Sequence, residues 1–193
     1  TDELIALTQT ASEYGGGYMA HIRSEANRFN ESLEELIAIA RQTNAHAEAY
    51  HLKASGKDNW PKMALAIAQI EKARAEGLSV SANMYSYTAG ATGFDAAMPP
   101  WVQEGGLDAW IGRLKDPKIR AQVIQEMRTP TSKWENLYLM AGAEGTKLIG
   151  FKTEKLKLLT GKTLAEVAKQ RGTSPEDTIL DLIIEDHTRV EVV

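Results

Sequence analysis

The sequence predicts an α/β fold in which short parallel strands alternate with helices. His21 and His51 each close a short apolar segment, and a cation follows each histidine two residues later, Arg23 and Lys53. The second histidine follows the first by 30 residues, which is about the length of one strand-plus-helix step. Tyr85 closes a third such segment 34 residues further on. Three neighbouring strands would thus deliver polar side chains to one edge of a sheet, where α/β enzymes build their active sites.

The first half of the chain has the alternation that this fold requires. Ser32 and Glu35 have the spacing of a capping box, which predicts the start of a helix there. Pro61 suits the first turn of another helix, where its missing N–H costs nothing. The expected elements are a helix over residues 2–14, a strand over 18–22, a helix ending near 44, a strand over 46–52, a helix over 61–77 and a strand over 78–84.

The alternation breaks near residue 88, where glycines and prolines become frequent. Long irregular stretches inside compact domains are usually functional lids or insertions. We therefore expect a β/α barrel segment over residues 1–87, an insertion that partly covers the site over 88–145, and a truncated C-terminal barrel segment over 146–193. Further helices are expected to begin at Asp116, Thr163 and Ser174, and strands are expected over 134–140 and 189–193.

The composition excludes several classes of function. The 193 residues are 43% hydrophobic and 25% charged with a net charge of −4, which is typical of a globular domain. Basic residues are not clustered, so we expect no nucleic-acid partner, and no apolar run approaches the roughly 20 residues of a membrane span. The absence of cysteine excludes a disulfide or a thiolate within the chain. We expect a cytoplasmic protein; secretion of a longer parent and the oligomeric state are left open.

The paired histidines suggest a metal site. Neutral imidazole is the commonest metal ligand in proteins, and a metal at this edge would polarise a carbonyl and activate water. Lys53 and Arg23 lie two residues past the histidines, so on a strand they would share the histidines' face. Two roles are open for Lys53 there, to hold a substrate carboxylate or to be a metal-bridging ligand, and Arg23 has the same relation to His21. Tyr85 would donate a hydrogen bond to substrate.

A second interpretation is structural. Core histidines with satisfied nitrogens are common, and in this interpretation the chain is a non-catalytic α/β module. Arg23 would then pair with Glu25 on the surface, and Lys53 would be a solvated loop residue.

Four segments of the sequence, 17–25, 50–56, 85–92 and 161–168, together resemble the D-aminoacylases, the N-acyl-D-amino-acid deacylases of the metal-dependent amidohydrolase superfamily. The resemblance implies a partial TIM-type (β/α) barrel, covering about strands five to seven, with an insertion after the third strand of this chain. It also implies zinc as cofactor and a small-molecule N-acyl amino acid as substrate.

The resemblance assigns roles to individual residues. His21 and His51 match the zinc-binding histidines of the family, and Lys53 and Tyr85 match its substrate-binding lysine and tyrosine. The chain departs from the family pattern at Ser86, where proline is usual, which leaves the preferred acyl group and side chain open. The family's His-x-His pair is absent from this sequence, and the general-base aspartate is expected outside it. The chain is therefore expected to be a segment of a longer deacylase and inactive alone; another amidohydrolase, such as a dihydroorotase-like cyclic amidase, is the alternative enzyme.

Overall fold

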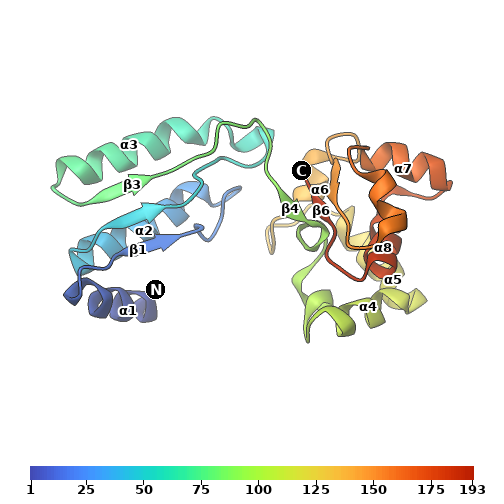
Figure 1. Ribbon diagram of the computed structural model, residues 1–193. Helices are drawn as coiled ribbons and strands as arrows, with labels where there is room; N and C mark the ends of the chain where they lie inside the picture. The colour runs from blue at the N-terminus through green and yellow to red at the C-terminus, as the bar shows by residue number, and fades with distance from the viewer. The chain divides into compact units, whose positions relative to one another are not determined.

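The computed structural model describes residues 1–193, which divide into two compact units, Thr1–Ser86 and Tyr87–Val193 (Figure 1). The first unit contains the elements α1 (Asp2–Glu13), β1 (Tyr18–Ala20), α2 (Phe29–Thr43), β2 (Ala47–Ala49), η1 (Lys57–Asn59), α3 (Lys62–Ala75) and β3 (Val80–Ala82). None of the helices in either unit combines the length and the apolar character that crossing a membrane requires. The division of the second unit near residue 145 stays a prediction.

The first unit is a parallel sheet in the order β1-β2-β3, in which α2 and α3 connect successive strands (Figure 1). The register aligns the strand ends, because Ala20 pairs with Ala49 and Ala49 pairs with Ala82. The alternation of parallel strands and helices that the sequence predicts is therefore confirmed. Because the strands end in register, the residues that follow β1 and β2 emerge at the same edge of the sheet.

Small residues on the strands allow the helices to pack closely on the sheet. Ala47 and Ala49 of β2 are fully buried, and they lie in one apolar cluster with residues of α2 such as Phe29 and Leu33. Gly17 permits a similarly close approach between strands, since a Cβ at this position would lie 2.6 Å from the carbonyl oxygen of His46. Close packing between the strands and helices of the first unit thus sets where the ends of its strands lie.

The predicted capping box at Ser32 and Glu35 is wrong. α2 begins one turn earlier, at Phe29, and the hydroxyl of Ser24 accepts a hydrogen bond from the Arg28 amide just before it. Burial of Phe29 explains the earlier start, because the helix gains a fully buried aromatic side chain in its first turn. Ser32 lies inside the helix, where its hydroxyl donates to the carbonyl of Arg28.

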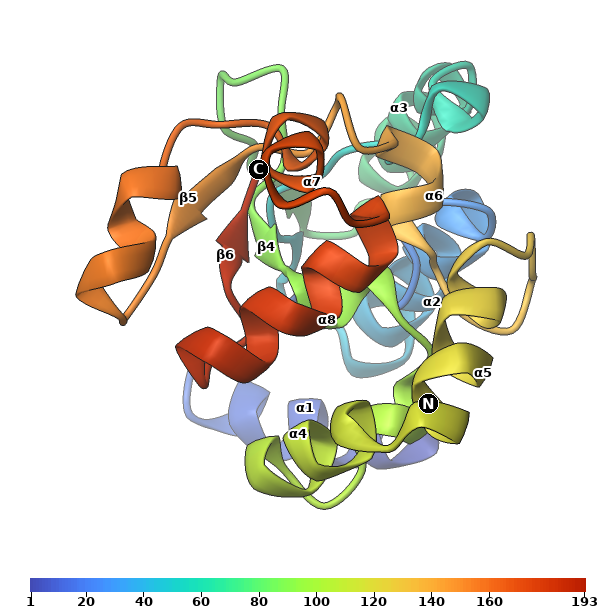
Figure 2. The same cartoon turned by 90° about the vertical axis from the view of Figure 1, so that its right-hand side faces the viewer.

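The second unit contains a small antiparallel sheet in the order β4 (Thr92–Gly93), β6 (Glu191–Val192), β5 (Leu148–Gly150) (Figure 2). Its helices and this sheet share one apolar core. Its fully buried side chains include Met127, Leu148 and Ile179. Asp186 is also buried, and its carboxylate accepts hydrogen bonds from the amides of Lys152 (3.1 Å) and Thr153 (2.7 Å). The elements are β4 (Thr92–Gly93), η2 (Phe94–Ala97), η3 (Pro100–Gln103), α4 (Leu107–Lys115), α5 (Pro117–Met127), α6 (Leu137–Ala141), β5 (Leu148–Gly150), η4 (Glu154–Leu159), α7 (Leu164–Arg171), α8 (Pro175–Asp186) and β6 (Glu191–Val192).

One expectation for the second unit needs correction. The strand expected over residues 134–140 is wrong, since this region contains the short helix α6. Asn136 explains the helix, because its side chain accepts a hydrogen bond from the Leu139 amide and donates one to the Met127 carbonyl. The strand expected at the end of the chain is present as β6, which pairs antiparallel with β4 and β5. The helix expected to begin at Thr163 is confirmed as α7, and a capping box starts it, with both reciprocal hydrogen bonds between Thr163 and Glu166.

Candidate metal centre

The two histidines that the sequence singles out lie side by side at the carboxyl edge of the parallel sheet. His21 directly follows the last residue of β1, and His51 follows β2 after Tyr50. Nδ1 of His21 is 3.2 Å from Nε2 of His51, and the ring centroids are 4.9 Å apart. The aligned ends of β1 and β2 produce this juxtaposition across 30 residues of sequence.

A tight turn after β2 directs the His51 ring. His51 has φ 40°, in the left-handed region that costs a non-glycine residue roughly 1 kcal/mol. Its amide donates to Oδ1 of Asn83 at 2.7 Å, and the side-chain amide of Asn83 donates in turn to Glu48. The hydrogen bonds that Glu48 accepts, led by that from Asn83, hold its pKa below the usual value. The neighbouring strands therefore support a strained backbone beneath a candidate functional side chain.

Lys53 lies close to the two histidines, but it does so from a loop and not from the strand that we expected. β2 ends at Ala49, so His51 and Lys53 lie in the following loop and the alternation of strand side chains does not apply to them. Nζ of Lys53 is nevertheless 2.9 Å from Nδ1 of His51 and 5.5 Å from the centre of the Tyr85 ring. The structure thus brings His21, His51, Lys53 and Tyr85 together through turns at the strand ends.

Glu25 is a member of the cluster that the sequence motifs do not single out. Its carboxylate is only 7% exposed, and its Oε1 lies 2.6 Å from Nζ of Lys53, 2.9 Å from Nδ1 of His51 and 3.5 Å from Nδ1 of His21. The available signal was an acidic residue four positions after His21, in the short segment that leads from the end of β1 into α2. In the structural interpretation of the sequence, that residue was expected to pair with Arg23 at the surface.

Arg23 is turned toward α2. Its guanidinium makes a bidentate interaction with Glu35, with both hydrogen bonds at 2.9 Å, so the expected pairing of Arg23 with Glu25 is wrong. The hydrogen bonds from Arg23 lower the pKa of Glu35 to about 2, and a hydrogen bond from Thr1 contributes a smaller part of this shift. Arg23 lies in the loop between β1 and α2, and Glu35 lies on α2. A substrate-binding role for Arg23 stays a prediction.

The other two histidines have partners of their own. His46 lies before β2, at the opposite end of the strand from His51, and its nitrogens contact the hydroxyls of Ser79 (2.9 Å) and Ser81 (3.1 Å). His187 ends α8 in the second unit and pairs with Asp108 at 2.9 Å. Both arrangements satisfy imidazoles in ordinary structural ways, in contrast to the facing rings of His21 and His51.

The facing nitrogens fit the requirements of zinc, and the Glu25 carboxylate lies beside them. Zinc–nitrogen bonds are about 2.0–2.1 Å long, so two imidazole nitrogens on one tetrahedral ion lie about 3.3 Å apart. The 3.2 Å between the His21 and His51 nitrogens matches this separation. One ligand atom each from His21, Glu25 and His51 can be chosen so that all three lie within 4.8 Å of one another. Nitrogen and carboxylate donors are those that zinc sites use.

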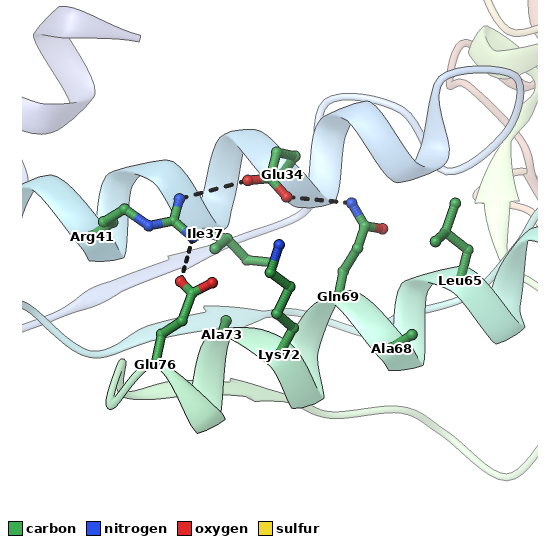
Figure 3. Close-up of a pocket in the computed structure, with 9 residues that line it drawn as sticks. All are labelled: Glu34, Ile37, Arg41, Leu65, Ala68, Gln69, Lys72, Ala73 and Glu76. Atoms are coloured by element: carbon green, nitrogen blue, oxygen red, sulfur yellow. Dashed lines mark hydrogen bonds and ion pairs between the residues drawn. The ribbon is translucent and has the colours of Figure 1, made fainter.

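The pocket between α2 and α3 is a different feature of the first unit (Figure 3). Its volume is about 250 Å³, and Arg41 lies across it between Glu34 (3.6 Å) and Glu76 (2.8 Å). Its lining comes from the helices and includes none of the residues of the histidine cluster. Charged side chains that already pair with one another occupy it, so we do not assign the chemistry to this pocket.

Comparisons with known proteins show what this chain is similar to. No family model matches the chain. The N-acyl-D-glutamate deacylase of Alcaligenes xylosoxydans xylosoxydans is 32% identical over 90 residues, which are 47% of this chain and 18% of that protein. The crystal structure of the N-acyl-D-glutamate deacylase from Bordetella bronchiseptica, in complex with zinc and a phosphonate that mimics the tetrahedral intermediate, superposes with a TM-score of 0.65 at 19% identity.

The D-aminoacylase structure described as defining a novel subset of amidohydrolases superposes with a TM-score of 0.60 at 26% identity. Each of these two superpositions covers 99% of this chain and 30% of the solved protein, so the chain spans less than a third of the length of those structures. The similarity thus extends through both units, although it concerns only part of each relative. The resemblance that the sequence motifs indicate is confirmed: this chain is similar to part of the D-aminoacylases, and its α/β fold is a part of their amidohydrolase-type barrel fold.

Proposed function

We propose that this chain provides the zinc-binding strand ends of an enzyme that hydrolyses the amide bond of N-acyl-D-amino acids. The observation that carries the proposal is the 3.2 Å separation of two imidazole nitrogens at the carboxyl ends of adjacent parallel strands. The curated relatives support the choice of substrate class, because one is named an N-acyl-D-glutamate deacylase and another a D-aminoacylase. The N-acyl-D-glutamate deacylase structure, which is a complex with zinc, supports the choice of metal.

The residues of the cluster have distinct roles in this proposal. His21 and His51 hold the zinc ion, which when bound supplies a Lewis acid that polarises the amide carbonyl and activates water. Lys53 lies beside His51 and carries a cation that suits the free carboxylate of a linear N-acyl amino acid. Tyr85 lies next to Lys53 and orients the bound substrate through its hydroxyl. In this proposal the general base is an aspartate outside the residues named here, as the resemblance implies.

The proposal is tested on the complete open reading frame that encodes this chain. Purified protein is assayed for zinc by mass spectrometry and for hydrolysis of N-acetyl-D-amino acids, their L-enantiomers and dihydroorotate. We expect bound zinc and a preference for the D-substrates. Bound zinc with hydrolysis of dihydroorotate alone would instead support a cyclic amidase.

Histidine variants make the test specific to this site. His21→Ala and His51→Ala should each lose zinc and hydrolysis, because each removes a ligand. His46→Ala is the matched control, since this imidazole contacts serine hydroxyls at the opposite end of β2 and its loss should leave both properties intact. Lys53→Ala should chiefly raise KM, because a point charge on a substrate carboxylate acts in the ground and transition states alike. Full zinc content and activity in His21→Ala would contradict the proposal.

A further inference from the structure

The buried carboxylate of Glu25 lies against the far nitrogen of His51. Nε2 of His51 faces His21, whereas Nδ1 on the other side of the same ring lies 2.9 Å from Oε1 of Glu25. The Glu25 side chain is 7% exposed, so water competes little for its oxygen atoms. The His51 ring is therefore held between a candidate metal position and a fixed acceptor.

The contact with Glu25 favours one of the two positions for the His51 proton. An ionised carboxylate only accepts hydrogen bonds, so a bond to Glu25 requires a hydrogen on Nδ1 of His51. In a neutral imidazole the other nitrogen, Nε2, then carries a free lone pair, and this is the atom that faces His21. Without such an acceptor the ring would be free to place its hydrogen on Nε2, which would block coordination there.

Lys53 is a competing donor beside the same carboxylate. Its Nζ lies 2.6 Å from Oε1 of Glu25, 3.2 Å from the carbonyl oxygen of His51 and 2.9 Å from Nδ1 of His51. An ammonium group has no acceptor, so it can bond to Nδ1 only if the hydrogen of His51 is on Nε2. The carboxylate and the carbonyl offer Lys53 two acceptors, and the Glu25 contact is the shortest of the three.

We propose that Glu25 is the positioning residue of this site. It holds His51 in the Nδ1–H tautomer so that Nε2 is available to zinc, and through the same oxygen it fixes the Lys53 cation beside the metal. This role rests on the proposed function for its metal, whereas the tautomer of His51 is a property of the metal-free chain. Carboxylates that accept a hydrogen bond from a metal-binding histidine typically improve metal affinity by about 10–100-fold.

The first measurement uses the 193-residue chain without metal. Long-range ¹H–¹⁵N NMR spectra of the imidazoles, recorded at about pH 8 where a histidine is ordinarily neutral, report which nitrogen carries the hydrogen. We expect the Nδ1–H tautomer of His51 in the wild-type chain and a shift toward Nε2–H in Glu25→Gln. Glu35→Gln is the matched control, because Glu35 is also a largely buried carboxylate with a cationic partner but none of its contacts is with a histidine. It should leave the His51 spectrum unchanged.

The second measurement is a titration of the same proteins with zinc alone, followed through the imidazole signals and by calorimetry. We expect Glu25→Gln to bind zinc about 10–100-fold more weakly than the wild-type chain, and Glu35→Gln to bind it equally well. Lys53→Met is the second variant, in case Glu25→Gln does not fold. It should keep the Nδ1–H tautomer, because the Glu25 carboxylate still accepts from His51.

The outcomes separate this inference from the proposed function. An Nε2–H tautomer of His51 in the wild-type chain or in Lys53→Met would overturn the role of Glu25, even if zinc binds. Weaker zinc binding in Glu25→Gln with an unchanged tautomer would also overturn it, because Glu25 would then act as a ligand. An Nδ1–H tautomer that depends on Glu25, in a chain whose histidines do not respond to zinc, would contradict the metal assignment and leave the orienting role established.

Discussion

Replacing Lys53 by methionine should destabilise the first unit through the carboxylate that it leaves behind. Lys53 is 28% exposed and Glu25 is 7% exposed, and their charged atoms are 2.6 Å apart. Removing one partner of a fully buried pair costs about 3–5 kcal/mol, whereas an exposed pair contributes about 0–1 kcal/mol. The intermediate exposure of Lys53, together with the His51 contact that Glu25 retains, leads us to expect a cost of about 2 kcal/mol.

A double-mutant cycle with Glu25→Gln isolates the pair. Each single change should cost about 2 kcal/mol and the double change about 3 kcal/mol, so the coupling energy should be about 1 kcal/mol. The two compact units make a single two-state transition of the whole chain an unsafe assumption. The free energy of unfolding should therefore be taken from amide hydrogen exchange in α2, which belongs to the first unit.

The double-mutant cycle also needs a control variant and a coupling energy below which the reasoning is refuted. Lys57→Met lies in η1 of the same unit and should cost less than about 0.5 kcal/mol, as expected for an exposed side chain. A coupling energy between Lys53 and Glu25 below about 0.3 kcal/mol would refute the reasoning, because two residues in contact inside a site should not behave as independent. Lys53 would then point away from Glu25 in solution.

Three other changes test the structure elsewhere. Asp186→Asn should destabilise the second unit by about 2 kcal/mol, because a neutral amide cannot replace a buried carboxylate that accepts two backbone N–H bonds. Unfolding followed by the fluorescence of the tryptophans of that unit measures this loss. A loss of stability below about 0.5 kcal/mol would contradict the prediction. Glu35, whose pKa falls to about 2 mainly through Arg23, stabilises the fold above its ordinary pKa, and this stabilisation is lost as the pH falls toward 2. Because Arg23 is 63% exposed, the loss should be at most about 1 kcal/mol. Glu35→Gln should flatten the dependence of stability on pH between about 5 and 2. An unchanged slope would show that the Arg23–Glu35 pair does not contribute to stability. Gly17→Ala should push β1 away from β2, since its Cβ would lie 2.6 Å from the carbonyl of His46; amide exchange at Tyr18 should rise, and unchanged protection would show that the strands have room.

Sequence patterns predicted the first unit well because its elements are short and strongly marked. The helix over residues 62–75 follows Pro61 and ends before Gly77, and the strands recur with the spacing of a parallel repeat. The start of α2 was misplaced because serine and glutamate three residues apart also occur inside helices, and only burial of Phe29 reveals the earlier start. In the second unit the strand pairs join residues about 40 to 100 positions apart, which no local pattern encodes.

The candidate site also contains residues that the sequence predicted and one residue that it did not. Matched register was enough to predict that His21 and His51 meet, because parallel strands of equal length end together. No local pattern marks Glu25, because its burial depends on the loop that follows Lys53, whose Ser55 amide bonds to the Glu25 carbonyl at 2.7 Å. A tertiary contact of this kind turns an apparently exposed acidic residue into a buried one.

The left-handed backbone of His51 constrains how this position can evolve. A residue at φ 40° must tolerate a conformation that glycine adopts freely, that asparagine, aspartate and histidine adopt at modest cost, and that β-branched residues resist. Among these four, only histidine offers an imidazole nitrogen, and only aspartate offers another strong zinc ligand on a shorter side chain. The left-handed backbone and the need for a metal-binding side chain thus each restrict which amino acids this position accepts. Under the proposed zinc-binding role, few amino acids meet both requirements, so a library randomised at this codon should return few functional residues other than histidine.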